Sequence, residues 1–344
     1  MFPHFEQMKD AMVLRNSLAP YIYTAAAQHY DLGISLLRPL YYEHPEDDDA
    51  YTWADTQYYF GDSMLIAPIA TAGSSPDPYT GVTHKQMWVP PGTWVEWGGE
   101  LTHVGPVILS KNYTLSEIPM LVSAGAVVPL KTMASVSAAR PDPLVWAIFV
   151  PSSVGCSSSQ TDLDSDDSAS DSDSAAAVCE CAGTGEVYED DGETRAYETN
   201  PGERLMLEYS GDWANTVVVK ITPPSEPEAE PKSALLAAPE GGSSRSSRGH
   251  VLQLRGLQQH QDRTLAGVSL RVGGAAAAEP VELARHSDTA EAVEDRAGLA
   301  AAAGWWTHTG HSLSTPRGSV VVDLGQQPKA EAIEVTLRFS AGAM

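Results

Sequence analysis

A cluster of carboxylates directly after a short apolar run is the first feature that could do chemistry. Residues 34–40 (ISLLRPL) are apolar around Arg38, and Glu43, Glu46 and Asp47–Asp49 follow them. Carboxylates at the end of a strand can serve as general acids or bases. Arg38 could orient an active-site carboxylate or form a buried ion pair. A solvated loop and a structural ion pair explain the same residues, and we favour them. Arg38 and Glu43 are kept as candidate substrate-binding residues.

Other clusters with the residue types of a metal site fail on spacing. The acidic stretch 162–173 has Asp167 where a calcium loop needs Gly, and it ends in Asp rather than Glu. The Glu189–Gly192 segment could hold a cation, but a hairpin tip turned by Gly192 is the simpler interpretation. Neither the three cysteines nor His308 and His311 form a zinc pattern. We predict no metal, no cofactor, no disulfide framework and no catalytic residue in this chain.

Three tryptophans could form a surface on which sugars stack. Trp88, Trp94 and Trp97 lie in neighbouring strand-like runs. Paired tryptophans in strands more often fill a core, and we favour that alternative. Asn112 begins an Asn-Tyr-Thr sequon, which matters only in a secreted chain.

Composition limits the partners. The chain has 344 residues, 42% of them hydrophobic, and carries 45 acidic against 21 basic residues for a net charge of −24. Such a surface repels nucleic acid and anionic lipid but accepts neutral ligands such as sugars. No apolar stretch is long enough for a membrane span. The first ten residues do not resemble a secretory signal.

The elements that would position these residues change in character along the chain. Residues 4–32 have helical periodicity interrupted at Pro20, and Gly33 is a plausible stop. Residues 34–40 are predicted to form a buried parallel strand, and residues 55–61 a short helix-like piece. Ser-, Asp- and Pro-rich segments at about 152–183 and 223–248 are predicted to be disordered. Short strands separated by Pro and Gly indicate sandwich domains; they are expected at 86–89, 93–97, 107–109, 120–122, 126–128, 144–150, 186–188, 205–209, 216–221, 251–254, 268–272, 319–324 and 332–339.

Five motifs in order resemble glycoside hydrolase family 31. They are LRNSLAPYIYT at 14–24, LRPL at 37–40 with Pro45 and Asp47, QYYFGDSMLIAP at 57–68, VPPGTW at 89–94 followed by IPMLVSAGAVVP at 118–129, and VYEDDG at 187–192. The resemblance covers residues 1 to about 200 and thins after about 222. It implies the end of a (β/α)8 barrel followed by mainly antiparallel β-sandwich domains. Residues 1–66 would be the last helix–strand–helix part of the barrel, 67–138 a proximal β-sandwich, and 139–344 a distal β domain with the two insertions.

The resemblance also implies a function. Family members are retaining α-glycosidases that hydrolyse terminal α-linked glucosyl or xylosyl units of oligosaccharides with two carboxylates. Both catalytic aspartates of the family precede the first helix seen here, so the chain alone is expected to be inactive. Oligosaccharide is then the substrate of the intact parent. The alternative is a non-catalytic carbohydrate-binding or scaffold protein built from the β domains.

Overall fold

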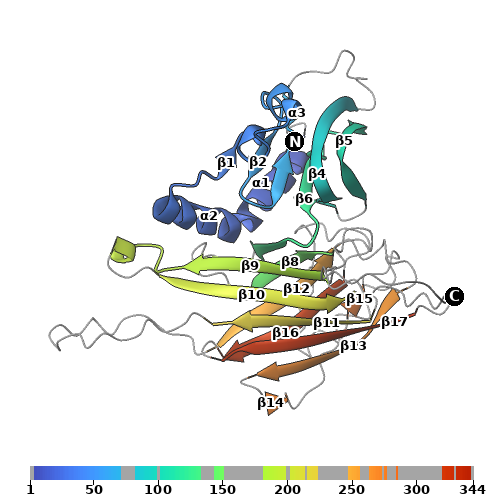
Figure 1. The fold of residues 1–344 in the computed structure, drawn as a ribbon. Coiled ribbons are helices and arrows are strands. Elements are labelled where there is room, and N and C mark those ends of the chain that lie inside the picture. Colours follow the sequence, from blue (N-terminus) through green and yellow to red (C-terminus); the bar gives the residue numbers. More distant parts are fainter. Residues whose placement is uncertain are drawn as a thin grey trace, which may run out of the picture.

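The protein consists mainly of antiparallel β-sheets with a few helices at its N-terminal end (Figure 1). The computed structural model describes residues 4–70, 82–98, 101–132, 143–150, 181–198, 202–213, 215–223, 247–255, 263–272, 275–276, 284–285, 320–328 and 331–341. These residues form three sheets, and the middle sheet packs on both of the others.

Two consecutive helices open the described chain. Helix α1 spans Phe5–Ser17 and α2 spans Ala19–Leu32, so the predicted interruption near Pro20 is confirmed. Pro20 lies in the first turn of α2, where a missing N–H leaves no hydrogen bond unmade. Gly33 ends α2 with a φ of +73° and donates its N–H to the His29 carbonyl at 2.9 Å. The predicted stop at Gly33 is therefore confirmed as well.

The first sheet is built from the strands that follow the helices. Its order is β1-β2-β3-β6-β4-β5, and its neighbouring strands run antiparallel. A 3-10 helix, η1 (Leu40–Tyr42), and α3 (Asp48–Thr52) lie between β1 and β2. The strands are β1 (Leu37–Arg38), β2 (Tyr58–Phe60), β3 (Met64–Ile66), β4 (Thr83–Glu96), β5 (Thr102–Tyr113) and β6 (Met120–Ser123).

Two local predictions for this region are wrong. The run 34–40 is a two-residue strand that pairs antiparallel with β2, and Leu37 is exposed rather than buried. Pro39 ends that strand because it has no N–H to donate to the ladder. Residues 58–60 form β2 instead of a helix, since their three aromatic side chains suit a pleated surface and Tyr59 is buried on one face.

The remaining strands form a sandwich of two sheets. One sheet has the order β15-β16-β12-β8-β7 and the other β14-β13-β17-β11-β10-β9. Strands β8 and β12 run parallel, whereas the other described pairs are antiparallel. The 3-10 helix η2 spans Ala196–Glu198. The strands are β7 (Val127–Lys131), β8 (Leu144–Phe149), β9 (Cys181–Glu189), β10 (Glu203–Asp212), β11 (Thr216–Thr222), β12 (Ser247–Arg255), β13 (Arg263–Val272), β14 (Ala275–Ala276), β15 (Ala284–Arg285), β16 (Val320–Pro328) and β17 (Ile333–Ala341).

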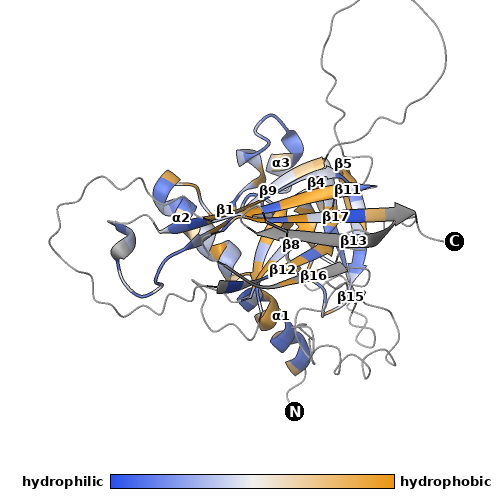
Figure 2. Ribbon diagram, turned by 90° about the horizontal axis from the view of Figure 1, so that it is seen from below, coloured by the Kyte–Doolittle hydropathy of each residue, from blue (hydrophilic) through white to orange (hydrophobic). Residues whose placement is uncertain are grey.

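Strand β8 shows why the middle sheet lies between two cores. Every residue of Leu144–Phe149 is buried. Trp146 and Ile148 face the sandwich core, whereas Val145 and Phe149 pack on the side of α1, α2 and the first sheet. A strand covered on both faces must be apolar throughout, and hydrophobic residues gather along the strands of the sandwich in Figure 2. The continuous apolar run in the sequence follows from this placement.

The predicted domain limits at residues 66 and 138 stay predictions. In the sheets, β3 ends at residue 66 and β4 follows it, and both belong to the first sheet, whereas β7 and β8 lie on either side of residue 138 and pair directly. Most of the predicted insertions 152–183 and 223–248 lie outside the described residues. The exceptions are Cys181–Gly183 in β9, Ser247–Arg248 in β12, and Pro223, which directly follows β11.

Candidate functional site

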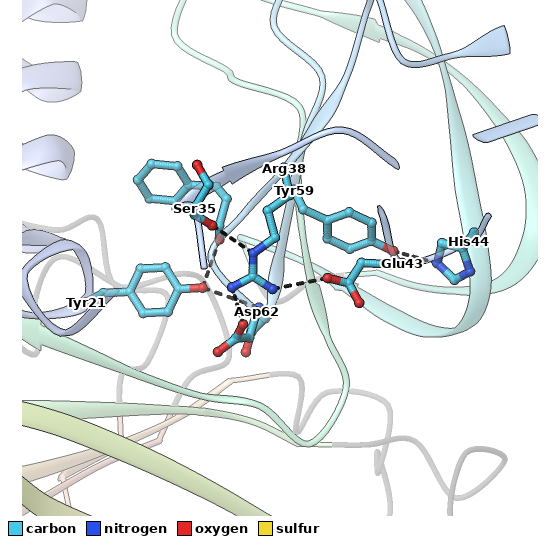
Figure 3. A network of polar contacts seen from close by, with 9 residues as sticks. Tyr21, Ser35, Arg38, Glu43, His44, Tyr59 and Asp62 are labelled. Carbon is cyan, nitrogen blue, oxygen red and sulfur yellow. Dashed lines mark hydrogen bonds and ion pairs between the residues drawn. The ribbon is translucent and has the colours of Figure 1, made fainter. Parts of the chain in front are cut away.

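The two candidate site residues meet in an ion-pair cluster at the edge of the first sheet (Figure 3). Arg38 donates from Nη1 to Glu43 Oε1 at 3.1 Å, from Nη2 to Asp62 Oδ1 at 2.5 Å, and from Nε to the Ser35 carbonyl at 2.8 Å. The guanidinium is buried, while the carboxylates of Glu43 and Asp62 are partly exposed. The structure thus brings Arg38 and Glu43 together and adds Asp62, which sequence reasoning missed.

The charge of Arg38 is balanced inside this cluster. Burial alone would lower the pKa of Arg38, but the hydrogen bonds and charges of Asp62 and Glu43 outweigh it and raise that pKa. Each of the three guanidinium nitrogens of Arg38 donates to an acceptor. Nη1 and Nη2, the two ends of the planar guanidinium, each hold one carboxylate. The cluster can therefore fix the direction of the Glu43 and Asp62 side chains.

Local sequence explains how the cluster is held. Arg38 lies in β1, Glu43 directly follows η1, and Asp62 lies in the turn between β2 and β3. Gly61 makes that turn possible with a φ of +65°. Tyr21 of α2 donates its hydroxyl to the Phe60 carbonyl at 2.8 Å and accepts from the Ser63 N–H at 3.3 Å. The helix thereby holds the turn that carries Asp62.

A buried tyrosine closes the other side of the cluster. Tyr59 Oη lies 2.8 Å from His44 Nε2, and the His44 ring contacts the ring of Trp88 at 87° and 5.7 Å. Burial, with the charge of Glu43 adding to it, raises the pKa of Tyr59, so the phenol keeps its proton. These contacts hold His44, the residue after Glu43, against the core of the first sheet.

The other acidic residues near Glu43 have structural positions. Asp47 caps α3 by accepting the Asp49 N–H at 3.0 Å, and Asp48 and Asp49 form its first turn. Carboxylates there interact favourably with the helix dipole. Glu46 is exposed in the loop before the cap. The structure does not bring these side chains into the Arg38 cluster.

The acidic segment at 189–192 is a hairpin tip, as the simpler interpretation predicted. Gly192 has a φ of +68° and donates its N–H to Asp190 Oδ1 at 2.8 Å. Asp191 accepts the N–H groups of Glu193 and Thr194 at 3.1 and 2.9 Å. Both aspartates therefore stabilise the turn through backbone hydrogen bonds.

The tryptophans lie in the core, as favoured above. Trp88 and Trp94 are 1% and 5% exposed, so neither offers a ring face to a sugar. Trp97 is partly buried, and the guanidinium of Arg255 lies 4.4 Å from its ring centre. The less favoured alternative, a sugar-stacking surface, is not present on Trp88 and Trp94.

The remaining candidates give one correction. Cys181 is disulfide-bonded, whereas the sequence predicts no role for the cysteines. The partner of Cys181 lies outside the described residues. The 162–173 stretch, His308 and His311 lie outside them as well. The low-complexity sequence around Cys156 and Cys179 does not predict a disulfide, because cysteine pairing depends on the distance between the two residues in the fold. Within the part of the chain that the structure describes, no group of three or more metal-ligating side chains is found. None of the described helices is long and apolar enough to cross a membrane.

Comparison with known proteins places the first sheet in a family. Residues 33–128 match the glycosyl hydrolase family 31 C-terminal domain. An alpha-glucosidase of Saccharolobus solfataricus is 32% identical over 127 residues, which cover 37% of this chain and 16% of that protein. Neutral alpha-glucosidase AB of Homo sapiens is 28% identical over 225 residues, covering 64% of this chain and 20% of that protein. The chain thus spans a fifth or less of the length of these relatives.

Solved structures show that the fold is shared over nearly the whole chain. A family 31 dextranase of Flavobacterium johnsoniae in complex with glucose matches with a TM-score of 0.57 and 17% identity, covering 94% of this chain and 32% of the dextranase. An alpha-1,4-glucan lyase of Gracilariopsis lemaneiformis gives a TM-score of 0.60 at 16% identity, covering 97% of this chain and 28% of the lyase. With the sequence match across β1 to β7, these relatives identify residues 33–128 as a glycosyl hydrolase family 31 C-terminal domain, and the solved structures show that the rest of the described chain has a similar fold.

Proposed function

We propose that this chain is the C-terminal portion of a retaining α-glycosidase that hydrolyses terminal α-linked glucosyl or xylosyl units of oligosaccharides. The observation that carries the proposal is the match of residues 33–128 to the family's C-terminal domain, in relatives named as glucosidases. The catalytic carboxylates would come from residues that this chain does not contain. Oligosaccharide would be the partner of the complete enzyme.

The Arg38 cluster explains why this portion would not be catalytic by itself. A retaining glycosidase needs two carboxylates about 5–5.5 Å apart with the scissile bond between them. Glu43 and Asp62 are instead both bonded to the guanidinium of Arg38. We assign Arg38 a positioning role, holding the turn of Asp62 and the segment of Glu43 in place.

The helices support a finer proposal about architecture. Phe5, Met8 and Met12 of α1 are 48%, 64% and 63% exposed, which is unusual for large apolar side chains at helical spacing. We propose that α1 and α2 belong to the last unit of a (β/α)8 barrel, whose other units would cover this face. The first sheet would then dock against the end of the barrel through α2.

The test is a comparison of this chain with the protein translated from the full native transcript. Both would be assayed with 4-nitrophenyl α-glucoside and α-xyloside, and the anomer released would be identified by proton NMR. We expect hydrolysis with retention by the full-length protein and no activity from the chain of 344 residues. A native transcript that encodes no further barrel segment, or a folded full-length protein inactive on both substrates, would overturn the proposal.

A further inference from the structure

A cleft between α2 and the end of β9 combines aromatic rings with carboxylates. It has a volume of about 210 Å³, smaller than the roughly 300–1,000 Å³ of pockets for drug-sized ligands, which leaves room for a single ring of a ligand. Helix α2 supplies one wall at helical spacing, and β9, its hairpin tip and η2 supply the other. The lining residues are Tyr23, Ala26, Ala27, Tyr30, Asp31, Tyr188, Asp190 and Tyr197.

The inner half of the cleft is held rigidly by Asp190. This carboxylate accepts the hydroxyl of Tyr23 at 2.6 Å, the hydroxyl of Tyr188 at 3.2 Å and the backbone N–H of Gly192 at 2.8 Å. Tyr23 and Tyr188 pack against each other with ring centres 5.8 Å apart. Two elements far apart in the sequence are thereby locked together, so the inner half needs no rearrangement to accept a ligand.

The outer half of the cleft presents aromatic surface to solvent. Tyr30 is 63% exposed and meets the ring of Tyr197 edge to face at 5.3 Å. Ala26 and Ala27 lie beside Tyr30 on α2 and line the cleft with side chains too small to fill it. An exposed ring on a rigid element, beside small residues, offers a flat apolar face at low entropic cost.

Charge separates the possible ligand classes. Arg204 forms ion pairs with Asp31 at 2.5 Å and with Glu186, and its guanidinium lies 5.5 Å from the Tyr188 ring centre. The Asp190 carboxylate already accepts three hydrogen bonds. The Arg204 guanidinium already lies over the Tyr188 ring and pairs with Asp31, so an organic cation entering the cleft would meet a like charge. A neutral ligand with one apolar face and several hydroxyls fits the rings and the acceptors better.

We propose that this tyrosine cleft, defined by Tyr23, Tyr30, Tyr188 and Tyr197, is a saccharide-binding site. A sugar ring stacks its C–H face on the exposed ring of Tyr30, beside the edge of Tyr197, and its hydroxyls donate to Asp31 Oδ1, the carboxylate oxygen opposite the one that accepts from Arg204. The site lies wholly within this chain and does not depend on the hydrolytic activity proposed above. Its failure and the failure of that activity are therefore measured separately.

The experiment is saturation-transfer NMR of the full chain with maltotriose and with isomaltotriose. We expect transfer to the sugar protons and a Kd on the order of 1 mM, typical of a shallow site with few contacts. Tyr30→Ala should raise the Kd about tenfold, because a stacked ring face is lost. Tyr42→Ala is the matched control, since Tyr42 is also 63% exposed and lies outside the cleft.

A second variant blocks the cleft without removing any tyrosine. Ala26 is exposed and lines the cleft, so Ala26→Trp should fold normally and fill the cleft; we expect it to abolish transfer. Near-ultraviolet circular dichroism confirms the fold of each variant. The proposal would be overturned if wild type gave no transfer to either sugar. It would also be overturned if Ala26→Trp and Tyr30→Ala gave the same transfer as wild type, or if choline bound more tightly than either sugar.

Discussion

The ring of Tyr21 occupies the space beside Gly61 where any other residue would place its Cβ. Gly61 also has a φ of +65°, a region that L-residues with a side chain avoid. Two independent constraints therefore require glycine at the turn that carries Asp62. The hydrogen bond from the Tyr21 hydroxyl to the Phe60 carbonyl exists because this approach is unobstructed.

Gly61→Ala should lower the free energy of unfolding by about 3 kcal/mol, combining left-handed strain with overpacking against Tyr21. Gly33→Ala is the matched control. Gly33 has a similar φ of +73° but nothing within 4 Å of its missing Cβ, so only the strain of about 1 kcal/mol applies. Urea unfolding of both variants measures the difference. Equal losses would show that Tyr21 moves aside at no cost.

Much of the strand pattern could be predicted from the sequence because it depends on local composition. The apolar run at 144–150 corresponds to β8, and the run at 216–221 to β11. Runs at 86–89 and 93–97 were expected as two strands but form the single long β4, with a register shift between Val89 and Gly92. A bulge lets one strand pass through Pro90 and Pro91, and this depends on pairing with β5 rather than on propensity.

The site could be predicted only in part, for a different reason. Arg38 and Glu43 are five residues apart and could be considered together. Asp62 is 24 residues from Arg38, and Tyr23 is 167 residues from Asp190. Contacts of this kind arise from chain topology, which periodicity does not encode. One signal was available for Asp62: it follows Gly61, and a glycine-turned segment can present a polar side chain back to its own sheet.

A buried ion pair joins the two sheets of the sandwich. Glu189 of β9 pairs with Arg248 of β12, and their side chains are only 4% and 6% exposed. Removing one partner leaves a buried charge uncompensated. We expect Glu189→Gln or Arg248→Met to lower the free energy of unfolding by about 3–5 kcal/mol.

The double variant Glu189→Leu/Arg248→Met tests whether the uncompensated charge, rather than lost packing, destabilises the single variants. It removes both charges and should recover most of that loss, because desolvation of the pair is then avoided. The exposed pair of Arg195 and Glu198 is the matched control, and Arg195→Ala should cost less than about 0.5 kcal/mol. A double variant as unstable as the single ones would show that packing, not charge, is responsible. Urea unfolding gives all four values.

The fork of Arg38 should matter more than its charge. Lysine in its place keeps a positive charge but cannot bond Ser35, Glu43 and Asp62 together. Because both carboxylates are partly exposed, we expect a modest loss of about 1–2 kcal/mol for both Arg38→Lys and Arg38→Met. A Lys variant with wild-type stability would contradict the positioning role. Thermal unfolding at low and at 1 M salt separates the Coulombic contribution.

The buried hydroxyl of Tyr21 should make the protein sensitive to alkali. Burial is the main cause that raises the pKa of Tyr21 to about 12, against 10.0 in an unstructured chain. The folded state holds the Tyr21 proton more tightly than the unfolded state does. The contribution of this hydroxyl to the free energy of unfolding is therefore fully present below pH 10 and is lost as the pH rises from 10 towards 12. A shift of two pKa units corresponds to about 2–3 kcal/mol.

The Tyr21→Phe variant isolates this effect from other groups that titrate in alkali. Phenylalanine cannot ionise, so the variant should lose less stability than wild type between pH 10 and 12, although it starts lower at pH 8 by about 1 kcal/mol for the lost hydrogen bond to Phe60. Tyr42→Phe, at an exposed ring, should follow the wild-type curve. Urea unfolding at pH 8, 10 and 11.5 measures the three curves. Parallel curves for wild type and Tyr21→Phe would mean that Tyr21 is solvated before it ionises, and that α2 separates from the turn of Gly61 without unfolding of the sandwich.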